Sequence, residues 1–204
     1  AGPHVGKDVV INIDLKDFFP TLTYRRVKGM FKGLGYSEQV ATVLGLLCTE
    51  PEMDEVVIDN ETYYVAKGQR FLPQGAPSSP MITNIICRRL DKRLSKLAES
   101  MGFTYSRYAD DITFSGRKES AGEIGALLGK TGDIVKHEGF KVHCDKTRVL
   151  HRGRQQEVTG IVVNEKLGVD RKTLRKLRAV LYQMEKDGIK NKTWTTKGDG
   201  CGDI

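Results

Sequence analysis

Three carboxylates stand at the ends of apolar segments, and this placement limits what the chain can fold into. Asp14 ends a β-branched, apolar run over 9–15, and Asp110 and Asp111 lie side by side between two short segments of alternating polarity. Such segments predict strands, and like charges at strand ends are costly unless a cation neutralises them. Pairing of the strands would gather the carboxylates around a divalent ion. The alternative for the Asp110–Asp111 pair alone is a solvated turn.

The composition is that of an ordinary globular chain with a basic surplus. Its 204 residues carry 33 Lys+Arg against 26 Asp+Glu, a net charge of +7, with 39% hydrophobic and 29% charged residues. These values exclude disordered, fibrous and membrane-spanning classes, and the surplus predicts an anionic partner. Residues 1–80 hold 8 basic and 10 acidic residues, whereas residues 81–204 hold 25 and 16. We therefore expect the second half to contact most of that anion.

The cysteines and the first residues indicate the cellular compartment in which the protein is expected. Cys48, Cys87, Cys144 and Cys201 are far apart and form no C-x-x-C pair, which argues against a zinc ribbon or a disulfide scaffold. The N-terminus has no basic stretch followed by an apolar one, so no export signal is expected. These features predict reduced thiols, a cytoplasmic protein without a membrane partner, and a chain that is a piece of a longer one.

The remaining pattern predicts helices and strands around one proline-rich loop. Three prolines and a glycine over 73–80 exclude regular structure there. Apolar residues spaced by three and four then predict one long helix, capped by Ser79, that ends at Gly102. The other expected elements are helices capped by Thr23 and Ser37, a hairpin with strands 56–58 and 63–65, a helix over 120–137, strands at 141–143, 148–150 and 158–163, and a helix from Arg171 with Leu174, Leu177, Leu181 and Met184 inward, before a loose tail over 195–204.

Four motifs in this order resemble the palm motifs of reverse transcriptases. They are IDLKDFFP around Asp14, LPQGAPSSP around Gln74, YADD at 108–111 and GFKVHCDKT around Lys146, and the resemblance covers about residues 9–163. The chain most resembles the bacterial retron-type enzymes, because VTG at 158–160 and the first four residues are similar to two of their elements. Group II intron enzymes share the palm motifs.

The resemblance implies an α+β fold, namely a ferredoxin-like polymerase palm with helices packed on one face of an antiparallel sheet, plus the start of a helical thumb. The palm would span 1–165, and a truncated thumb root with its tail would span 166–204. The implied function is RNA-directed DNA polymerase, which adds dNTPs to a primer 3′ end on an RNA template. Without a fingers segment before the palm, we expect the chain alone to be weakly active or inactive.

The resemblance also assigns site residues. Asp14, Asp110 and Asp111 are the expected catalytic residues, and with the Leu15 carbonyl they would hold two Mg²⁺ ions, for which Mn²⁺ could substitute. The expected nucleotide-binding residues are Phe19, as the aromatic that excludes a ribose 2′-hydroxyl, with Gln74, Gly75 and Lys146. The expected primer and template contacts are Tyr108, Val158, Thr159, Gly160, Arg171, Lys172 and Arg175.

Simpler interpretations stand beside these roles. Phe18 and Phe19 could both be core aromatics, and Lys146 could be a solvated surface residue. His4 is expected to be disordered rather than functional. The basic side of the helix from Arg171 could be a solvated face or could contact the backbone of a nucleic-acid duplex.

Two other functions remain open for the whole chain. One is an RNA-binding or antiviral-defence module that keeps the palm without polymerase activity, and the other is a nucleotide cyclase of similar topology. The three intact carboxylates favour a polymerase over the binding module, and Gln74 and Phe19 argue against the cyclase. The expected partners are an RNA template, a DNA or RNA primer, dNTPs and a structured noncoding RNA, and the oligomeric state is left open.

Overall fold

The computed structural model describes residues 1–188, and residues 189–204, which include Cys201, Trp194 and the tail expected to be loose, lie outside the described part. The helices in chain order are η1 (Gly2–His4), α1 (Phe18–Thr21), α2 (Tyr24–Gly33), α3 (Glu38–Leu47), α4 (Ser79–Ile86), α5 (Arg88–Ser100), η2 (Lys118–Glu123), α6 (Ile124–His137), η3 (Cys144–Lys146) and α7 (Arg171–Asp187). The strands are β1 (Val9–Lys16), β2 (Glu50–Ile58), β3 (Glu61–Phe71), β4 (Phe103–Tyr108), β5 (Asp111–Gly116), β6 (Lys141–Val142), β7 (Arg148–His151), β8 (Glu157–Val158) and β9 (Ile161–Val162).

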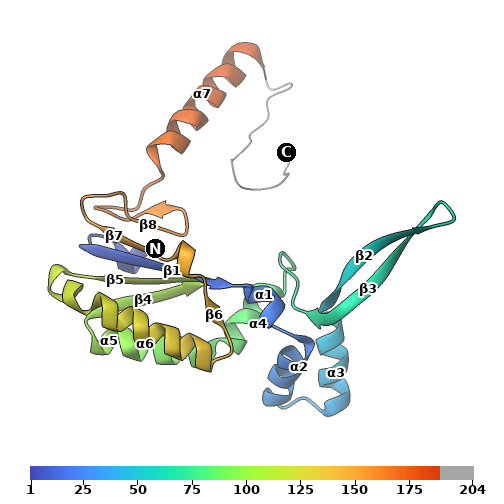
Figure 1. The fold of residues 1–204 in the computed structure, drawn as a ribbon. Helices are drawn as coiled ribbons and strands as arrows, with labels where there is room; N and C mark the ends of the chain where they lie inside the picture. The colour runs from blue at the N-terminus through green and yellow to red at the C-terminus, as the bar shows by residue number, and fades with distance from the viewer. Residues whose placement is uncertain (189–204) are drawn as a thin grey trace.

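Five strands form one antiparallel sheet around β1 (Figure 1). On one side of β1 lies β5, followed by β4, and on its other side β7 and β6 pair with successive parts of the same strand. The order of elements β1, α4–α5, β4, β5, α6, β7 with strand order β4-β5-β1-β7 is the split βαβ of ferredoxin-like folds. The expected α+β fold with an antiparallel sheet is therefore confirmed.

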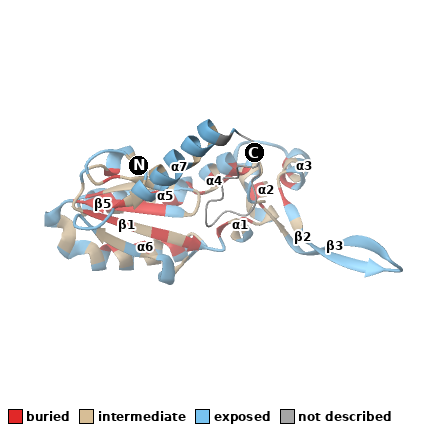
Figure 2. Cartoon of the chain, turned by 90° about the horizontal axis from the view of Figure 1, so that it is seen from above, coloured by how far each residue is buried: buried red, intermediate tan, exposed pale blue. Residues whose placement is uncertain are grey.

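Alternation along β1 decides which side chains meet the helices. Ile11, Ile13 and Leu15 are at most 2% exposed and pack into the main core, which α5 and α6 complete from beneath the sheet (Figure 1). The buried residues concentrate along β1 and β5 (Figure 2). Asn12 and Asp14 alternate with the core residues and so point to the opposite face. On that face Val10 is covered by Val158 and Val163, which leaves the end around Asp14 to carry a site.

A second group of elements lies beside the sheet, where α2 and α3 support the β2–β3 hairpin (Figures 1 and 2). The strands of this hairpin are longer than the expected segments 56–58 and 63–65. Asp59 and Asn60 form its turn with φ of 51° and 65°, the left-handed geometry that suits a two-residue hairpin turn. Most residues of the hairpin are exposed (Figure 2).

The long helix expected after the proline-rich loop is two helices. Cys87 separates α4 from α5 with a ψ of 0°, well away from the helical value near −42°. Ser79 is the first residue of α4 rather than its cap, and its hydroxyl donates to the Pro73 carbonyl at 2.7 Å. Thr23 precedes α2 without a side-chain capping bond, whereas Ser37 accepts from the Val40 amide as expected.

Two further expectations about the C-terminal part are wrong. The single strand over 158–163 is a hairpin of two short strands, because Thr159 and Gly160 take φ of 49° and 79° and reverse the chain. The apolar side of α7 does not face inward: Leu177 and Leu181 are 41% and 54% exposed, and the helix extends away from the sheet (Figure 1). No helix within residues 1–188 is both long and apolar enough to cross a membrane.

Candidate active site

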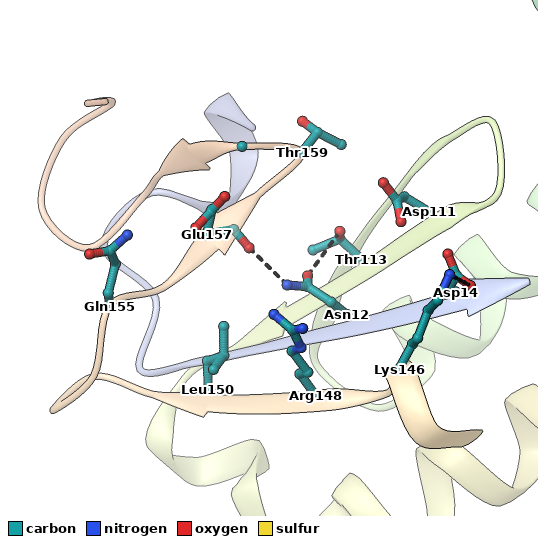
Figure 3. A pocket seen from close by; sticks show the side chains of 11 residues that line it. Asn12, Asp14, Asp111, Thr113, Lys146, Arg148, Leu150, Gln155, Glu157 and Thr159 are labelled. Carbon is teal, nitrogen blue, oxygen red and sulfur yellow. Dashed lines mark hydrogen bonds and ion pairs between the residues drawn. The ribbon is translucent and has the colours of Figure 1, made fainter. Parts of the chain in front are cut away.

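Pairing of β1 with β5 brings the two carboxylate segments together. Asp14 and Asp111 are direct partners in this antiparallel register, so their side chains lie on the same face of the sheet (Figure 3). The Leu15 amide donates to the Asp110 carbonyl at 3.1 Å, which places Asp110 at the end of the same strand pair. The structure thus brings together the three acidic residues that the sequence singled out.

Three negatively charged carboxylates are electrostatically unfavourable at this place in the sheet. Burial raises the pKa of Asp110, and the Asp14 carboxylate raises it further. Burial likewise raises the pKa of Asp111, to which both other carboxylates add. Like charges held close favour the protonated forms unless a cation intervenes.

Lys146 supplies one such cation. Its Nζ lies 3.2 Å from Oδ2 of Asp14, and its side chain is 60% exposed against 16% for Asp14. Lys146 is the last residue of the short helix η3, and the amide of His143, the residue before this helix, donates to the Asp14 carbonyl at 2.8 Å. Lys146 is therefore neither buried nor merely solvated, because it pairs with a carboxylate of the site.

The donor set fits a hard divalent cation in kind, since it consists of carboxylate oxygens that repel one another. Within residues 1–188, however, no three His, Cys, Asp or Glu side chains are arranged as a group that could hold a metal ion. Mg²⁺ in phosphoryl-transfer sites commonly takes one or two carboxylates and completes its shell with water and substrate phosphates. The pair Asp14 and Asp111 across the strands, with Asp110 beside them, matches that requirement.

Two cavities meet at Asp14 and Lys146. One, of about 380 Å³, is lined on its other sides by Leu15, Phe18, Phe19, Gln74, Asp110 and His143, with Lys16, Asp17 and Pro20. The other, of about 350 Å³, is lined by Asn12, Asp111, Thr113, Arg148, Leu150, Gln155, Glu157, Thr159 and Gly160 (Figure 3). Of the expected residues, Phe19 and Gln74 therefore line one cavity and Thr159 and Gly160 line the other, while Asp14 and Lys146 line both.

The first cavity separates the roles of the two adjacent phenylalanines. Phe18 is 3% exposed and stacks on Phe140 with ring centroids 5.5 Å apart, so it is a core residue. Phe19 is only partly buried and meets Phe18 edge-on at 5.4 Å. Gln74 lies in the same lining. Gly75 has a φ of 95° and is in neither lining, so it shapes the loop rather than the wall.

Some residues that line the second cavity were not part of any sequence motif. The side-chain amide of Asn12 donates to the Glu157 carbonyl at 2.8 Å and its oxygen accepts from Thr113 at 3.2 Å (Figure 3). These bonds hold the β8–β9 hairpin over the sheet. Counting back two residues from Asp14 would have found Asn12, but Arg148 and Glu157 carry no comparable signal in the sequence.

Some expected primer and template residues lie elsewhere. Val158 is 2% exposed and packs with Val10 and Val163 beneath the hairpin, so its side chain is covered by protein. Tyr108 is 72% exposed and pairs with Asp111 across β4 and β5. The expected basic contacts begin α7, outside both cavities, and are Arg171, Lys172 and Arg175.

His4 is ordered and buried, contrary to expectation. Its Nδ1 and Nε2 each lie 2.7 Å from a hydroxyl, of Ser115 and Ser106 respectively. Burial, with smaller effects of the N-terminal amine and Lys7, lowers the pKa of His4 from 6.5 to about 4. The histidine ties the first turn of the chain to the strands that lead to Asp110 and Asp111.

Comparisons with known proteins agree with the motifs. The family model described as reverse transcriptase (RNA-dependent DNA polymerase) matches residues 2–184. The retron Mx162 and Mx65 reverse transcriptases of Myxococcus xanthus are each 47% identical over 90% of this chain, and the retron Ec86 reverse transcriptase of Escherichia coli is 36% identical over 90%. The chain spans 41%, 42% and 52% of the lengths of these three relatives.

Solved structures show the same fold at low identity. Two structures of a Candida tropicalis telomerase, one without ligand and one with a fragment of telomeric RNA, each share 14% identity and a TM-score of 0.54. The likeness covers 80% and 81% of this chain but only 33% and 30% of those chains. It speaks for the fold alone, and it agrees with the α+β palm that the sequence predicts.

Proposed function

The chain belongs to the reverse transcriptase family, in its bacterial retron-type branch, and from this membership we propose that it forms the palm of an RNA-directed DNA polymerase. The observation that carries the proposal is the register that pairs Asp14 with Asp111 and anchors Asp110 beside them. A fold that merely bound RNA would gain nothing from holding Asp110 and Asp111 beside Asp14, where burial and the neighbouring carboxylates raise the pKa values of Asp110 and Asp111.

Asp14, Asp110 and Asp111 would hold two Mg²⁺ ions, with the Leu15 carbonyl as a further oxygen ligand. Such ions supply positive charge to the phosphoryl group and to both the attacking and the leaving oxygen. Lys146 balances the carboxylates through its contact with Asp14. Because the lysine is exposed and flexible, it can turn from Asp14 towards the phosphates of an incoming nucleotide.

The cavity that contains Phe19 and Gln74 would receive the dNTP. Phe18 stacks on Phe140 in the core and meets the Phe19 ring edge-on, so it supports Phe19 from the core side. A ribose 2′-hydroxyl would meet the Phe19 ring, and steric rejection of this kind is an effective way to exclude a close analogue. Gln74 offers an amide for hydrogen bonding to the nucleotide.

The cavity beneath β8–β9 would receive the primer end. Thr159 and Gly160 form its rim and Arg148 offers a cation for phosphate, while the exposed Tyr108 stands next to Asp111 in the register. Val158 acts by anchoring the hairpin in the small core with Val10. The chain itself would be a palm over 1–165 and a thumb root from 166, with α7 presenting Arg171, Lys172 and Arg175 to the backbone of the template–primer duplex.

The partners that follow from this function are an RNA template, a primer and dNTPs, and the retron relationship adds a structured noncoding RNA. Primer extension on an RNA template tests the proposal, with the complete protein and this chain assayed side by side in Mg²⁺ and in Mn²⁺. Asp110→Asn should abolish extension. Asp133→Asn, at an exposed carboxylate of α6, is the matched control and should extend like the parent.

Two outcomes would contradict the proposal. Extension by the complete protein that survives Asp110→Asn would place the reaction elsewhere. Binding of RNA–DNA duplex without extension under any metal would favour the alternative of an RNA-binding module.

A further inference from the structure

Arg107 has a buried side chain and no role in the proposed polymerase site as described so far. It lies on β4, its side chain is 3% exposed, and it faces α4 and α5 rather than the carboxylates. A buried charge is strongly destabilising unless it is paired and hydrogen-bonded. The partners of this guanidinium therefore indicate what the arginine does.

Asp91 of α5 holds the guanidinium in one plane. Nε and Nη2 of Arg107 donate to Oδ1 and Oδ2 of Asp91 at 2.7 and 2.8 Å, which is a bidentate pair. The Tyr105 hydroxyl donates to the same Oδ1 at 2.7 Å. Bidentate pairs fix the direction of the remaining donors as well as their distance. The orientation of Arg107 is thus set by residues of the helix layer.

One further donor of Arg107 reaches the turn that carries the acidic pair, and another contact reaches α4. Nη1 donates to the Ala109 carbonyl at 2.9 Å, and Nη2 also donates to Oδ1 of Asn84 at 3.2 Å. Ala109 has a φ of 49°, a left-handed conformation that is uncommon for a residue with a Cβ and persists where its surroundings hold it.

Asp110 is therefore held through the peptide groups on both of its sides. The carbonyl before it, of Ala109, accepts from Arg107, and its own carbonyl accepts from the Leu15 amide at 3.1 Å. Fixing both peptide planes fixes the position and direction of the Asp110 Cα–Cβ bond relative to β1. The first of these bonds connects the helix layer to the site through the sheet.

We propose that Arg107 is a positioning residue that sets the place of the Asp110 carboxylate relative to Asp14, and so the affinity of the site for its divalent ions. This inference rests on the proposed polymerase function. Arg107 touches no substrate, and it acts through the Ala109–Asp110 peptide. Partners that orient metal ligands commonly change metal affinity by about 10- to 100-fold when they are lost.

The test compares Arg107→Lys with Arg93→Lys in the complete protein. Lysine at 107 keeps the charge beside Asp91 but cannot form the two-pronged pair and reach Ala109 together. Arg93 is the matched control, because it pairs with Glu138 at 2.7 Å in another part of the helix layer. The readouts are Mn²⁺ affinity by electron paramagnetic resonance without turnover, the Mg²⁺ concentration for half-maximal extension, and Tm.

We expect Arg107→Lys to weaken Mn²⁺ binding and to raise the half-maximal Mg²⁺ concentration, each by about 10-fold, whereas Arg93→Lys changes neither. Unchanged metal dependence in a folded Arg107→Lys protein would overturn the inference. If the lysine variant does not fold, Asn84→Ala removes one exposed acceptor and leaves the Asp91 pair intact. It should shift the metal dependence less and in the same direction, and no shift would again count against the inference.

The parent protein separates this inference from the function on which it rests. If the parent binds Mn²⁺, loses it with Asp110→Asn and extends primers, then only the role of Arg107 is at stake in the variants. If the parent does none of these, the proposed function fails first and the positioning role fails with it.

Discussion

Acid should destabilise this protein through a single buried histidine. The His4 ring is fully buried between the hydroxyls of Ser106 and Ser115, and its pKa is lowered from 6.5 to about 4. The unfolded chain therefore takes up a proton on this ring at a higher pH than the folded chain does. The stability that neutral His4 contributes is present in full above pH 6.5 and is lost as the pH falls towards 4.

The magnitude follows from the size of the pKa shift. Each unit of pKa difference corresponds to about 1.4 kcal/mol, so the loss approaches about 3 kcal/mol by pH 4 and is already about 2 kcal/mol at pH 5. A domain of this size is stable by only about 5–15 kcal/mol. The effect should therefore be visible in an ordinary denaturation experiment.

Urea unfolding at several pH values between about 7.5 and 4.5 measures this loss. His4→Gln keeps hydrogen-bonding capacity but cannot titrate. Between pH 7.5 and pH 5, its free energy of unfolding should therefore fall by about 2 kcal/mol less than that of the parent. His151→Gln, at an exposed position of β7, is the matched control and should follow the parent. Parallel curves for the parent and His4→Gln would refute the argument that burial holds the ring neutral.

Three other predictions concern the proposed contacts with the nucleotide and with the template–primer duplex. Phe19→Ala should raise ribonucleotide incorporation and largely keep dNTP use, as measured by competitive extension; equal discrimination in Phe19→Ala and the parent would assign the exclusion of ribonucleotides to another residue. Phe18→Ala should instead lower the free energy of unfolding by about 3–5 kcal/mol, because it empties a core position. Lys146→Met should change the free energy of unfolding by less than about 1 kcal/mol, since exposed ion pairs contribute little, yet raise KM for dNTP in steady-state extension. Arg175→Ala should weaken duplex binding for every sequence alike and lower the salt dependence by about one ion, and a titration unchanged between about 50 and 200 mM salt would exclude a backbone contact.

Short-range signals in the sequence predicted much of this fold. The apolar run up to Asp14 and the alternating segments around Asp110 are strands because β-branched and alternating residues suit a half-buried sheet. The start of α7 was likewise predictable from the sequence, and the Asp170 side chain caps the helix by accepting from the amides of Lys172 and Thr173. These features depend on neighbours in the chain, so they can be recognised without the tertiary structure.

Local signals failed where a residue's neighbours come from distant segments. Val158 looked like a primer contact but is buried against Val10, about one hundred and fifty residues away in the chain. His4 was expected to be disordered because it lies at one end of the chain, but its two hydroxyl partners are on β4 and β5. The inward face predicted for α7 needed a surface to pack on, and the described part of the chain provides none over Leu181.

By itself, the sequence determined that carboxylates stand next to apolar strand-forming segments, since this is a property of adjacent residues. Only the tertiary structure decided that Asp14 stands opposite Asp111, because register depends on pairing across the whole length of β1 and β5. It also decided that Lys146 lines two cavities and that Arg107, held by Asp91 of α5, reaches the Ala109 carbonyl. The physical reason is the same in each case: packing of layers brings together side chains and backbone groups whose separation along the chain carries no information about their distance in space.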